Sequence, residues 1–274
     1  DACIDRINVL LQRDDIPVNP RVDAATLLLA HYQTSGLSDD AERVTAMVAP
    51  WIADETLTPT YHALWLLQLA HFRDKQGRDV EAMRHYDEAR TIADKTALLL
   101  PPLRIFIHLG RSIVALCAGD PETAEAERVQ AASYWTFARK LDRALDAAVS
   151  AWIAIHRQEY ESAVGIVREM VPQMDVYGPV WLRFGARLLH AVCEFEADND
   201  ADVAPILARA REIVQGTSLH RHLFGCDALE AWIALRRFGI EQARPLIERS
   251  VASRNAHQGA FMVRTHPTLL SEVY

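Results

Sequence analysis

The 274-residue chain is poor in the residues that interrupt helices or cross-link small folds, with 11 Gly, 12 Pro and 4 Cys. It sustains no period-2 alternation of apolar and polar residues, and no Asn-Gly or Asp-Gly pair marks a hairpin, which argues against a β-sheet. The cysteines show no CxxC spacing, which makes a zinc site or a disulfide framework unexpected. We expect four reduced, buried thiols in a cytoplasmic protein: Cys3, Cys117, Cys193 and Cys226.

Basic residues are too few and too scattered to form a surface for phosphates. The formal net charge is −8, with 13 basic and 20 acidic residues up to Phe137 and 16 basic and 17 acidic after it. A protein that binds nucleic acid through its phosphates needs a local basic excess. No apolar run approaches the ~20 residues of a membrane span. We therefore expect this chain to contact neither nucleic acid nor membrane.

The sequence also lacks the motifs that carry common chemistries. It contains no GxxxxGK[ST], HExxH, GxSxG, GxGxxG or DDxxD pattern, so nothing indicates an enzyme, a cofactor or a metal site. An enzyme built on a helical array stays open as an alternative, and it would need convergent titratable side chains in a deep pocket.

One stretch of the sequence is nearly repeated eighty residues later. Residues 151–163 read AWIAIHRQEYESA, and residues 231–243 read AWIALRRFGIEQA. In each, an apolar stretch leads into a short polar turn and then into an alanine. An alanine recurs in this way at spacings of 39 to 42 residues, with a turn signal before six of the seven: Ala2, Ala41, Ala82, Ala124, Ala163, Ala204 and Ala243.

A period of roughly 40 residues is typical of arrays of helical hairpins. We therefore predict an all-α fold, a superhelical array of antiparallel helix pairs in which each unit has an A helix and a B helix. The recurring alanine lies early on the B helix, where a small side chain lets the two helices approach closely.

Prolines and glycines set the expected helix ends. Prolines lie at or near the starts of A helices, at Pro20, Pro59, Pro101 and Pro179, and glycines lie at A-to-B turns, at Gly36, Gly77, Gly119 and Gly239. The predicted A helices fall near 21–35, 59–75, 102–118, 142–157, 180–197 and 219–237. The predicted B helices fall near 1–13, 39–53, 79–98, 122–140, 160–176, 201–215 and 240–255.

The predicted array begins and ends half-way through a unit. We expect one repeat domain over residues 1–256, with its first unit truncated. Residues 257–274 would form an irregular segment or a partial next repeat, because they include Pro267 and no B helix follows them. Repeat proteins normally close with polar capping units, so this pattern suggests a piece of a longer protein.

The stretch QGRDVEAMRHYDEARTI resembles the tetratricopeptide repeat (TPR). Gly77 stands at the turn, Ala82 at the small position early on the B helix, Tyr86 one turn on, and Ala89 at the later small position. Ala70, on the preceding A helix, takes the small position that faces them.

The units are longer than the usual 34 residues of that repeat. In this respect the chain resembles the helical region of MalT-type bacterial transcription regulators, which are large LuxR-family proteins. There the region links an ATPase to a DNA-binding domain and senses an effector or a partner. The resemblance implies a non-enzymatic sensing and protein-interaction domain of a cytoplasmic regulator. A stand-alone scaffold or chaperone that holds a peptide in its concave groove would give the same pattern.

Candidate binding residues come from the phase of the A helices. Trp152 and Trp232 both lie eleven residues before their alanine, and His71 takes the same phase. In a TPR-type superhelix this phase tends to face the concave groove, where aromatic side chains suit an apolar ligand or a peptide side chain. The alternative is that both tryptophans belong to the core.

A polar stripe supplies the other candidates. Asp142 and Asp146 occupy the phase that Arg183 and Arg187 take on a later A helix, and His190 continues that stripe. Asp146 should then face Arg187, either in an inter-repeat salt bridge or in a groove whose arginines receive an anionic group. The expected partner is a protein, a peptide or a small-molecule effector in the groove.

Overall fold

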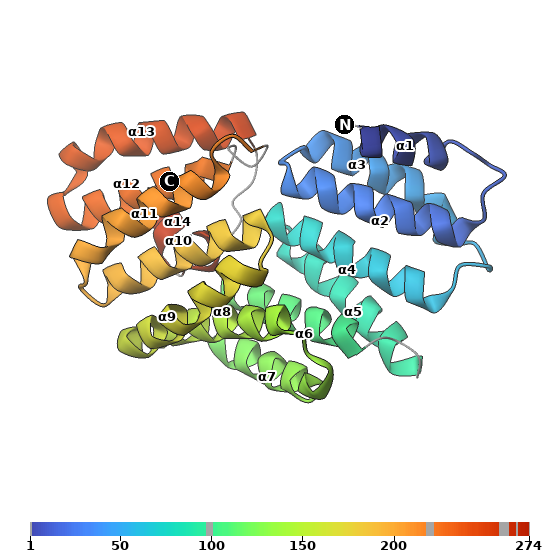
Figure 1. Cartoon of the computed structure of the whole chain (residues 1–274), viewed down its shortest axis with the longest axis horizontal. Coiled ribbons are helices and arrows are strands. Elements are labelled where there is room, and N and C mark those ends of the chain that lie inside the picture. The colour runs from blue at the N-terminus through green and yellow to red at the C-terminus, as the bar shows by residue number, and fades with distance from the viewer. Residues whose placement is uncertain (1, 97–100, 218–221, 258–262, 267, 274) are drawn as a thin grey trace.

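The fold is an array of helix pairs (Figure 1). The computed structural model describes residues 2–96, 101–217, 222–257, 263–266 and 268–273, and its regular structure within these ranges is entirely helical. Helix α1 (Ala2–Leu11) precedes the pairs and packs on the first of them. The pairs are α2 (Val18–Thr34) with α3 (Ser38–Val48), α4 (Pro59–Lys75) with α5 (Asp79–Lys95), α6 (Pro101–Cys117) with α7 (Pro121–Ala132), α8 (Lys140–His156) with α9 (Tyr160–Tyr177), α10 (Val180–Glu196) with α11 (Asp200–Val214), and α12 (Phe224–Phe238) with α13 (Ile240–His257).

The predicted all-α array is confirmed, and most predicted helices match to within a few residues. The largest differences are at α3 and α7, which end earlier than expected and lead into the 3-10 turns Ala49–Trp51 and Trp135–Phe137, and at α12, which begins at Phe224 instead of near residue 219. In the first case Pro50 is the cause, since it has no N–H to continue the α-helical ladder. The division of the chain at residue 256 stays a prediction.

In each of the six pairs, a residue with positive φ follows the end of the A helix. Glycine supplies it at four turns, as predicted, but Gln158 and Asp198 supply it at the other two, with φ of 62° and 60°. The amide that follows each of these two residues donates to a carbonyl five residues back, at 2.8 Å in both turns. This pattern is the Schellman motif, which satisfies carbonyls that a helix end leaves open.

Replacing Gln158 by glycine should therefore stabilise the protein. A left-handed conformation costs a residue with a Cβ about 1 kcal/mol relative to glycine, and the Gln158 side chain is exposed. We expect urea denaturation to give a free energy of unfolding higher by about this amount. The matched change, Gly119→Gln, should lower it by a similar amount, since Gly119 has a φ of 77° and open space around it. Equal stability of the two variants would contradict this explanation of the turns.

The recurring small position is the fourth residue of each B helix. Five of the predicted alanines occupy it and are fully buried against the A helix: Ala41, Ala82, Ala124, Ala163 and Ala243. The prediction is wrong for the other two. Ala204 is exposed, because α11 begins at Asp200 and Val203 takes the fourth position, and Ala2 at the start of α1 is also exposed.

The TPR-like segment packs as the resemblance implies. Ala70, Ala82 and Ala89 are fully buried, and Tyr86 is nearly so. The Tyr86 ring lies against the next repeat where Gly110 leaves room for it, since a Cβ on Gly110 would lie 2.4 Å from the ring carbon Cζ. The small positions thus set the spacing within a repeat, and Gly110 sets it between two repeats.

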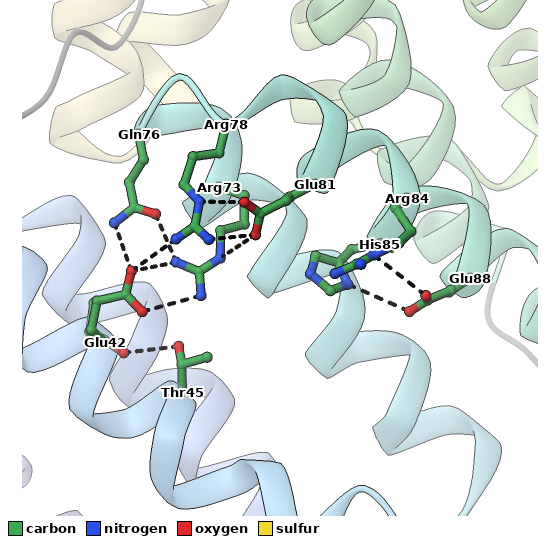
Figure 2. A network of polar contacts seen from close by, with 10 residues as sticks. Glu42, Thr45, Arg73, Gln76, Arg78, Glu81, Arg84, His85 and Glu88 are labelled. Atoms are coloured by element: carbon green, nitrogen blue, oxygen red, sulfur yellow. Dashed lines mark hydrogen bonds and ion pairs between the residues drawn. The ribbon is translucent and has the colours of Figure 1, made fainter.

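An ion-pair network joins the first two helix pairs (Figure 2). Arg73, near the end of α4, is buried and bonds Glu42 of α3, with an Nη2–Oε2 distance of 3.2 Å. Gln76 donates to the same carboxylate at 3.0 Å, and Arg78 pairs with Glu81 at 2.6 Å. Burial raises the pKa of Glu42, but the hydrogen bonds from Arg73 and Gln76 outweigh it and hold that pKa below its usual value.

The array curves until its two halves meet (Figure 1). The Lys75 ammonium at the end of α4 lies 5.4 Å from the ring centroid of Trp181 at the start of α10. His222 bonds the carbonyl oxygen of Thr34, 188 residues away in the sequence, at 2.7 Å. The A helices therefore surround an inner, concave face. None of the helices in the described ranges has the length and apolarity that crossing a membrane requires.

Candidate binding site on the concave face

The concave face contains a cavity of about 520 Å³. Five consecutive A helices, α2, α4, α6, α8 and α10, form most of its wall, and the surface that they present is mainly apolar. The apolar lining includes Leu67, Leu103, Phe106, Leu145, Val149 and Leu182. A cavity of this volume, with apolar walls and a few polar groups, is typical of a ligand site.

Equivalent positions on four successive A helices line this wall. Ala30, His71, Ile113 and Trp152 come from α2, α4, α6 and α8, and each lies eleven residues before the small position of its repeat. The four side chains thus reach the cavity from four successive repeats. A ligand in the cavity would touch all four repeats at once.

Three titratable side chains from the end of α4 reach the cavity, and burial shifts the pKa of each. Burial raises the pKa of Asp74 to about 6, against the opposing charge of Arg264. Burial lowers the pKa of Lys75 to about 8, against the opposing charge of Asp74. Burial and the nearby Lys75 charge lower the pKa of His71 to about 4. At pH 7 the cavity therefore holds a neutral His71 imidazole, a mostly ionised Asp74 carboxylate and a mostly protonated Lys75 ammonium.

The low pKa of His71 predicts a loss of stability in acid. The unfolded chain takes up a proton at His71 near pH 6.5, but the folded chain does so only near pH 4. The stability that the neutral ring contributes is thus fully present above pH 6.5 and is lost as the pH falls towards 4. The measurement is the free energy of unfolding of the unmodified protein and of His71→Gln at several pH values. As the pH falls from 6.5 to 4, the unmodified protein should lose stability relative to the variant. A difference independent of pH would contradict the burial of a neutral His71. The opposite contribution of Asp74 is present in both chains and cancels in the difference.

The C-terminal segment of the chain folds back onto the concave face. The 3-10 turn Val263–Thr265 and helix α14 (Leu269–Val273) lie inside the curve of the array (Figure 1). Arg264 inserts between the ends of α4 and α5, where it bonds Asp74 and donates to Asp79 at 2.6 Å. His156 donates from Nε2 to the carbonyl oxygen of Thr265 at 2.7 Å. Arg264 and Thr265 thereby form part of the cavity wall.

His266 is enclosed between two tryptophans and a carboxylate. Its ring centroid lies 4.6 Å from that of Trp232 and 6.3 Å from that of Trp152, both in edge-on geometry. Its Nδ1 accepts backbone N–H groups at 3.1 and 3.2 Å, so Nε2 carries the proton and donates to Glu196 at 3.0 Å. The imidazole is therefore held in one tautomer.

Glu272 anchors the end of the segment to α12. Its carboxylate accepts two hydrogen bonds from Arg236, at 2.8 and 3.0 Å, and one from the indole N–H of Trp232 at 2.8 Å. These bonds, that from Arg236 above all, lower the pKa of Glu272 to about 2. The carboxylate therefore stays ionised well below the pH at which a free glutamate takes up a proton.

The structure places the six candidate residues in three different environments. His71 and Trp152 line the cavity, whereas Trp232 is fully buried beneath the C-terminal segment. The remaining three, Arg183, Arg187 and His190, lie outside the cavity lining.

The expected pairing of Asp146 with Arg187 is wrong. Asp146 lies 3.4 Å from Arg128 of α7, and Arg187 bonds Asp175 of α9. This phase of an A helix faces the B helix of the preceding repeat, so the polar stripe binds neighbouring units together and does not open into the groove. Two other stripe residues pair within or beside their own helix: Asp142 with Arg139, and His190 with Glu194.

Several cavity residues escaped the sequence analysis. Asp74, Lys75 and Trp181 all line the cavity. Lys75 meets Trp181 because the curvature of the array brings the end of α4 to the start of α10, and that curvature cannot be predicted from the sequence alone. Arg264 reaches the cavity from 190 residues beyond Asp74. The adjacent opposite charges at the end of an apolar A helix were the one visible signal.

The described residues contain no group of three or more His, Cys, Asp or Glu side chains that could hold a metal ion. Cys117, Cys193 and Cys226 are free thiols, and the side chain of Cys3 lies outside the described part of the structure. Burial raises the pKa of both Cys117 and Cys226 to about 12, so neither thiol is activated as a nucleophile.

Comparison with known proteins gives a fold and no closer assignment. No protein-family model matches the chain, and no curated protein matches it. A Rap protein solved in complex with competence and sporulation factor has a TM-score of 0.70 at 12% identity, over 99% of this chain and 74% of that one.

Two further solved structures are similar. A tetratricopeptide repeat protein from Parabacteroides merdae has a TM-score of 0.57 at 12% identity, over 98% of this chain and 90% of that one. The apo form of RapI has a TM-score of 0.53 at 11% identity, over 93% and 71%. At these identities the likeness shows the fold alone: this chain is a TPR-like array of helical repeats.

Proposed function

We propose that the chain is a non-enzymatic sensing and interaction domain whose concave cavity binds an apolar part of a peptide or protein. The observation that carries this proposal is the cavity of about 520 Å³, with apolar walls drawn from five A helices and a few buried polar groups at one end. The similar Rap structure in complex with competence and sporulation factor supports a binding role for such an array.

Binding in the cavity offers a mechanism for sensing. A ligand there touches helices from four or five repeats, and each repeat contacts mainly its neighbours, so the array bends easily. The ligand would favour the curvature that fits it best and shift the population of the array towards that curvature. Lys75 and Trp181 both line the cavity and join α4 to α10, so a change of curvature would alter their contact.

For the wider setting we propose the sensor region of a cytoplasmic bacterial transcription regulator, on the resemblance to MalT-type proteins alone. A stand-alone scaffold that holds a peptide in the same cavity fits the geometry equally well. The neighbouring coding sequence separates the two. A phosphate-binding loop upstream or a helix-turn-helix downstream supports the regulator, and the absence of both supports the scaffold.

Selection from a phage-displayed library of random peptides, with the full chain as bait, tests the cavity as a peptide site. We expect enriched peptides to bind the unmodified chain in calorimetry and to bind the variant Ala148→Trp about tenfold or more weakly, because Ala148 lines the cavity. The matched change on an exposed surface, Ala204→Trp, should leave binding unaltered. No enriched peptide, or peptides that bind both variants equally, would contradict the proposal.

A further inference from the structure

The C-terminal segment contacts the array as an extended ligand would. A further repeat would stack beyond α12 and α13 at the end of the array. The segment instead lies along the concave face and reaches α4, α5, α8, α10 and α12 through side-chain or backbone bonds. Contact with the same face of many successive units is how a linear partner binds a helical-repeat array.

Three subsites on the array hold the segment, and each has its own chemistry. Asp74 and Asp79 form an acidic subsite that receives the Arg264 guanidinium. Further along, the two tryptophans and Glu196 form an aromatic subsite, which receives an imidazole. Arg236, with the Trp232 indole N–H, forms a basic subsite that receives a carboxylate.

The segment is held by two apolar side chains and by a larger number of polar bonds, and a partner with similar side chains could replace both. Within its described part, the deeply buried apolar side chains are Leu269 and Val273. Hydrogen bonds and ion pairs that water or a similar partner group can replace contribute little net stability. The segment gains its advantage from being tethered, since attachment to the same chain gives it a high effective concentration.

We propose that this surface is the docking site of a partner-protein segment, and that residues 263–273 are its internal competitor. The three subsites define the partner segment: a basic residue, a histidine two positions later, and a carboxylate eight positions after the basic residue, as in Arg264, His266 and Glu272. The inference rests on the proposed function, because it assumes that the concave face binds protein segments. Beyond the proposed function, the inference states which partner segment fits the concave face and which segment of this chain occupies that face when the partner is absent.

A fluorescein-labelled peptide of residues 263–273 tests this inference in fluorescence anisotropy. The released chain is the full-length protein with Arg264→Glu and Glu272→Gln, which reverse the charge at one anchor and remove it at the other without creating a new partner for a change at Arg236. We expect it to bind the peptide about tenfold or more tightly than the unmodified chain, whose own segment competes. A control chain with Arg84→Glu and Glu88→Arg, an exposed pair on α5, should behave as the unmodified chain does. Circular dichroism checks that each chain is folded, and the single change Glu272→Gln replaces the double one if folding fails.

A charge exchange locates the bound peptide. Adding Arg236→Glu to the released chain should abolish binding, and a peptide with Glu272→Arg should restore it. Equal affinity for the released and unmodified chains, or binding that ignores Arg236→Glu, would overturn the inference. Dimerisation of the unmodified chain in this concentration range would also overturn it, because a second copy would then supply the segment.

The outcomes separate this inference from the proposed function. If library peptides bind the cavity and are lost in Ala148→Trp, while the 263–273 peptide fails to bind the released chain, the competitor role is overturned and the cavity proposal stands. If the 263–273 peptide binds as expected but no library peptide responds to Ala148→Trp, the cavity proposal fails and the docking surface stands.

Discussion

Replacement of Trp232 by alanine is expected to lower the free energy of unfolding by about 3–5 kcal/mol. The indole is fully buried, packs edge-on against Phe195 at 4.9 Å between ring centroids, and also contacts His266. Its loss would leave a cavity between α10, α12 and the C-terminal segment, and would remove one hydrogen bond to Glu272. Urea denaturation followed by far-UV circular dichroism measures the effect.

A control on the same helix separates burial from aromatic character. Phe238, at the end of α12, is 64% exposed. Replacing it by alanine should change the stability by less than about 0.5 kcal/mol. If Trp232→Ala proves as mild as Phe238→Ala, the packing of α12 against the C-terminal segment is not as described.

Replacement of Ala82 by leucine is expected to cost about 1–3 kcal/mol. Ala82 is the fourth residue of α5 and is fully buried where α5 crosses α4. A leucine there has no space, because the opposing position on α4 is the buried Ala70, so the two helices must move apart. The same denaturation measurement reports the cost.

Ala204 supplies the matched control for this change. It also lies early on a B helix, but one residue out of phase, and its side chain is exposed. Ala204→Leu should alter the stability by less than about 0.5 kcal/mol. Similar losses for Ala82→Leu and Ala204→Leu would mean that the small position does not set the spacing of helices within a repeat.

The repeat architecture was predictable because its physical cause leaves a local trace. Each A helix of the six pairs ends in a residue with positive φ, and five of the six B helices present a buried alanine as their fourth residue, so both features recur along the chain. The sequence signal is lost where a residue other than glycine adopts positive φ, or where a residue other than alanine takes the small position. Gln158 and Asp198 adopt the left-handed conformation without being glycine, and Val203 replaces alanine at the small position. The error at Ala204 followed from the second of these exceptions.

The inner surface was predictable only in part. The phase that contains His71 and Trp152 does face the cavity, because it follows from the helix period within each repeat. The prediction for the polar stripe was wrong because the helix period alone does not distinguish the concave face of an A helix from the face that packs on the preceding B helix. Arg187 and Asp146 are polar because they bridge repeats.

The position of the C-terminal segment could not be predicted from the sequence. Its contacts join residues separated by up to 190 positions, as between Asp74 and Arg264, and they depend on the curvature accumulated over all repeats. The sequence predicted only that residues 257–274 form an irregular segment or a partial next repeat, with Pro267 as the signal. The complementary groups on the array, such as Arg236, look like ordinary surface charges in the sequence.

A double-mutant cycle on Arg236 and Glu272 tests most directly whether this segment lies in the concave face. Arg236→Glu and Glu272→Arg should each lower the free energy of unfolding, and the exchanged pair should recover stability, with a coupling of about 1 kcal/mol. The bidentate geometry, at 2.8 and 3.0 Å, favours such recovery. A coupling indistinguishable from zero would mean that the segment does not dock on α12.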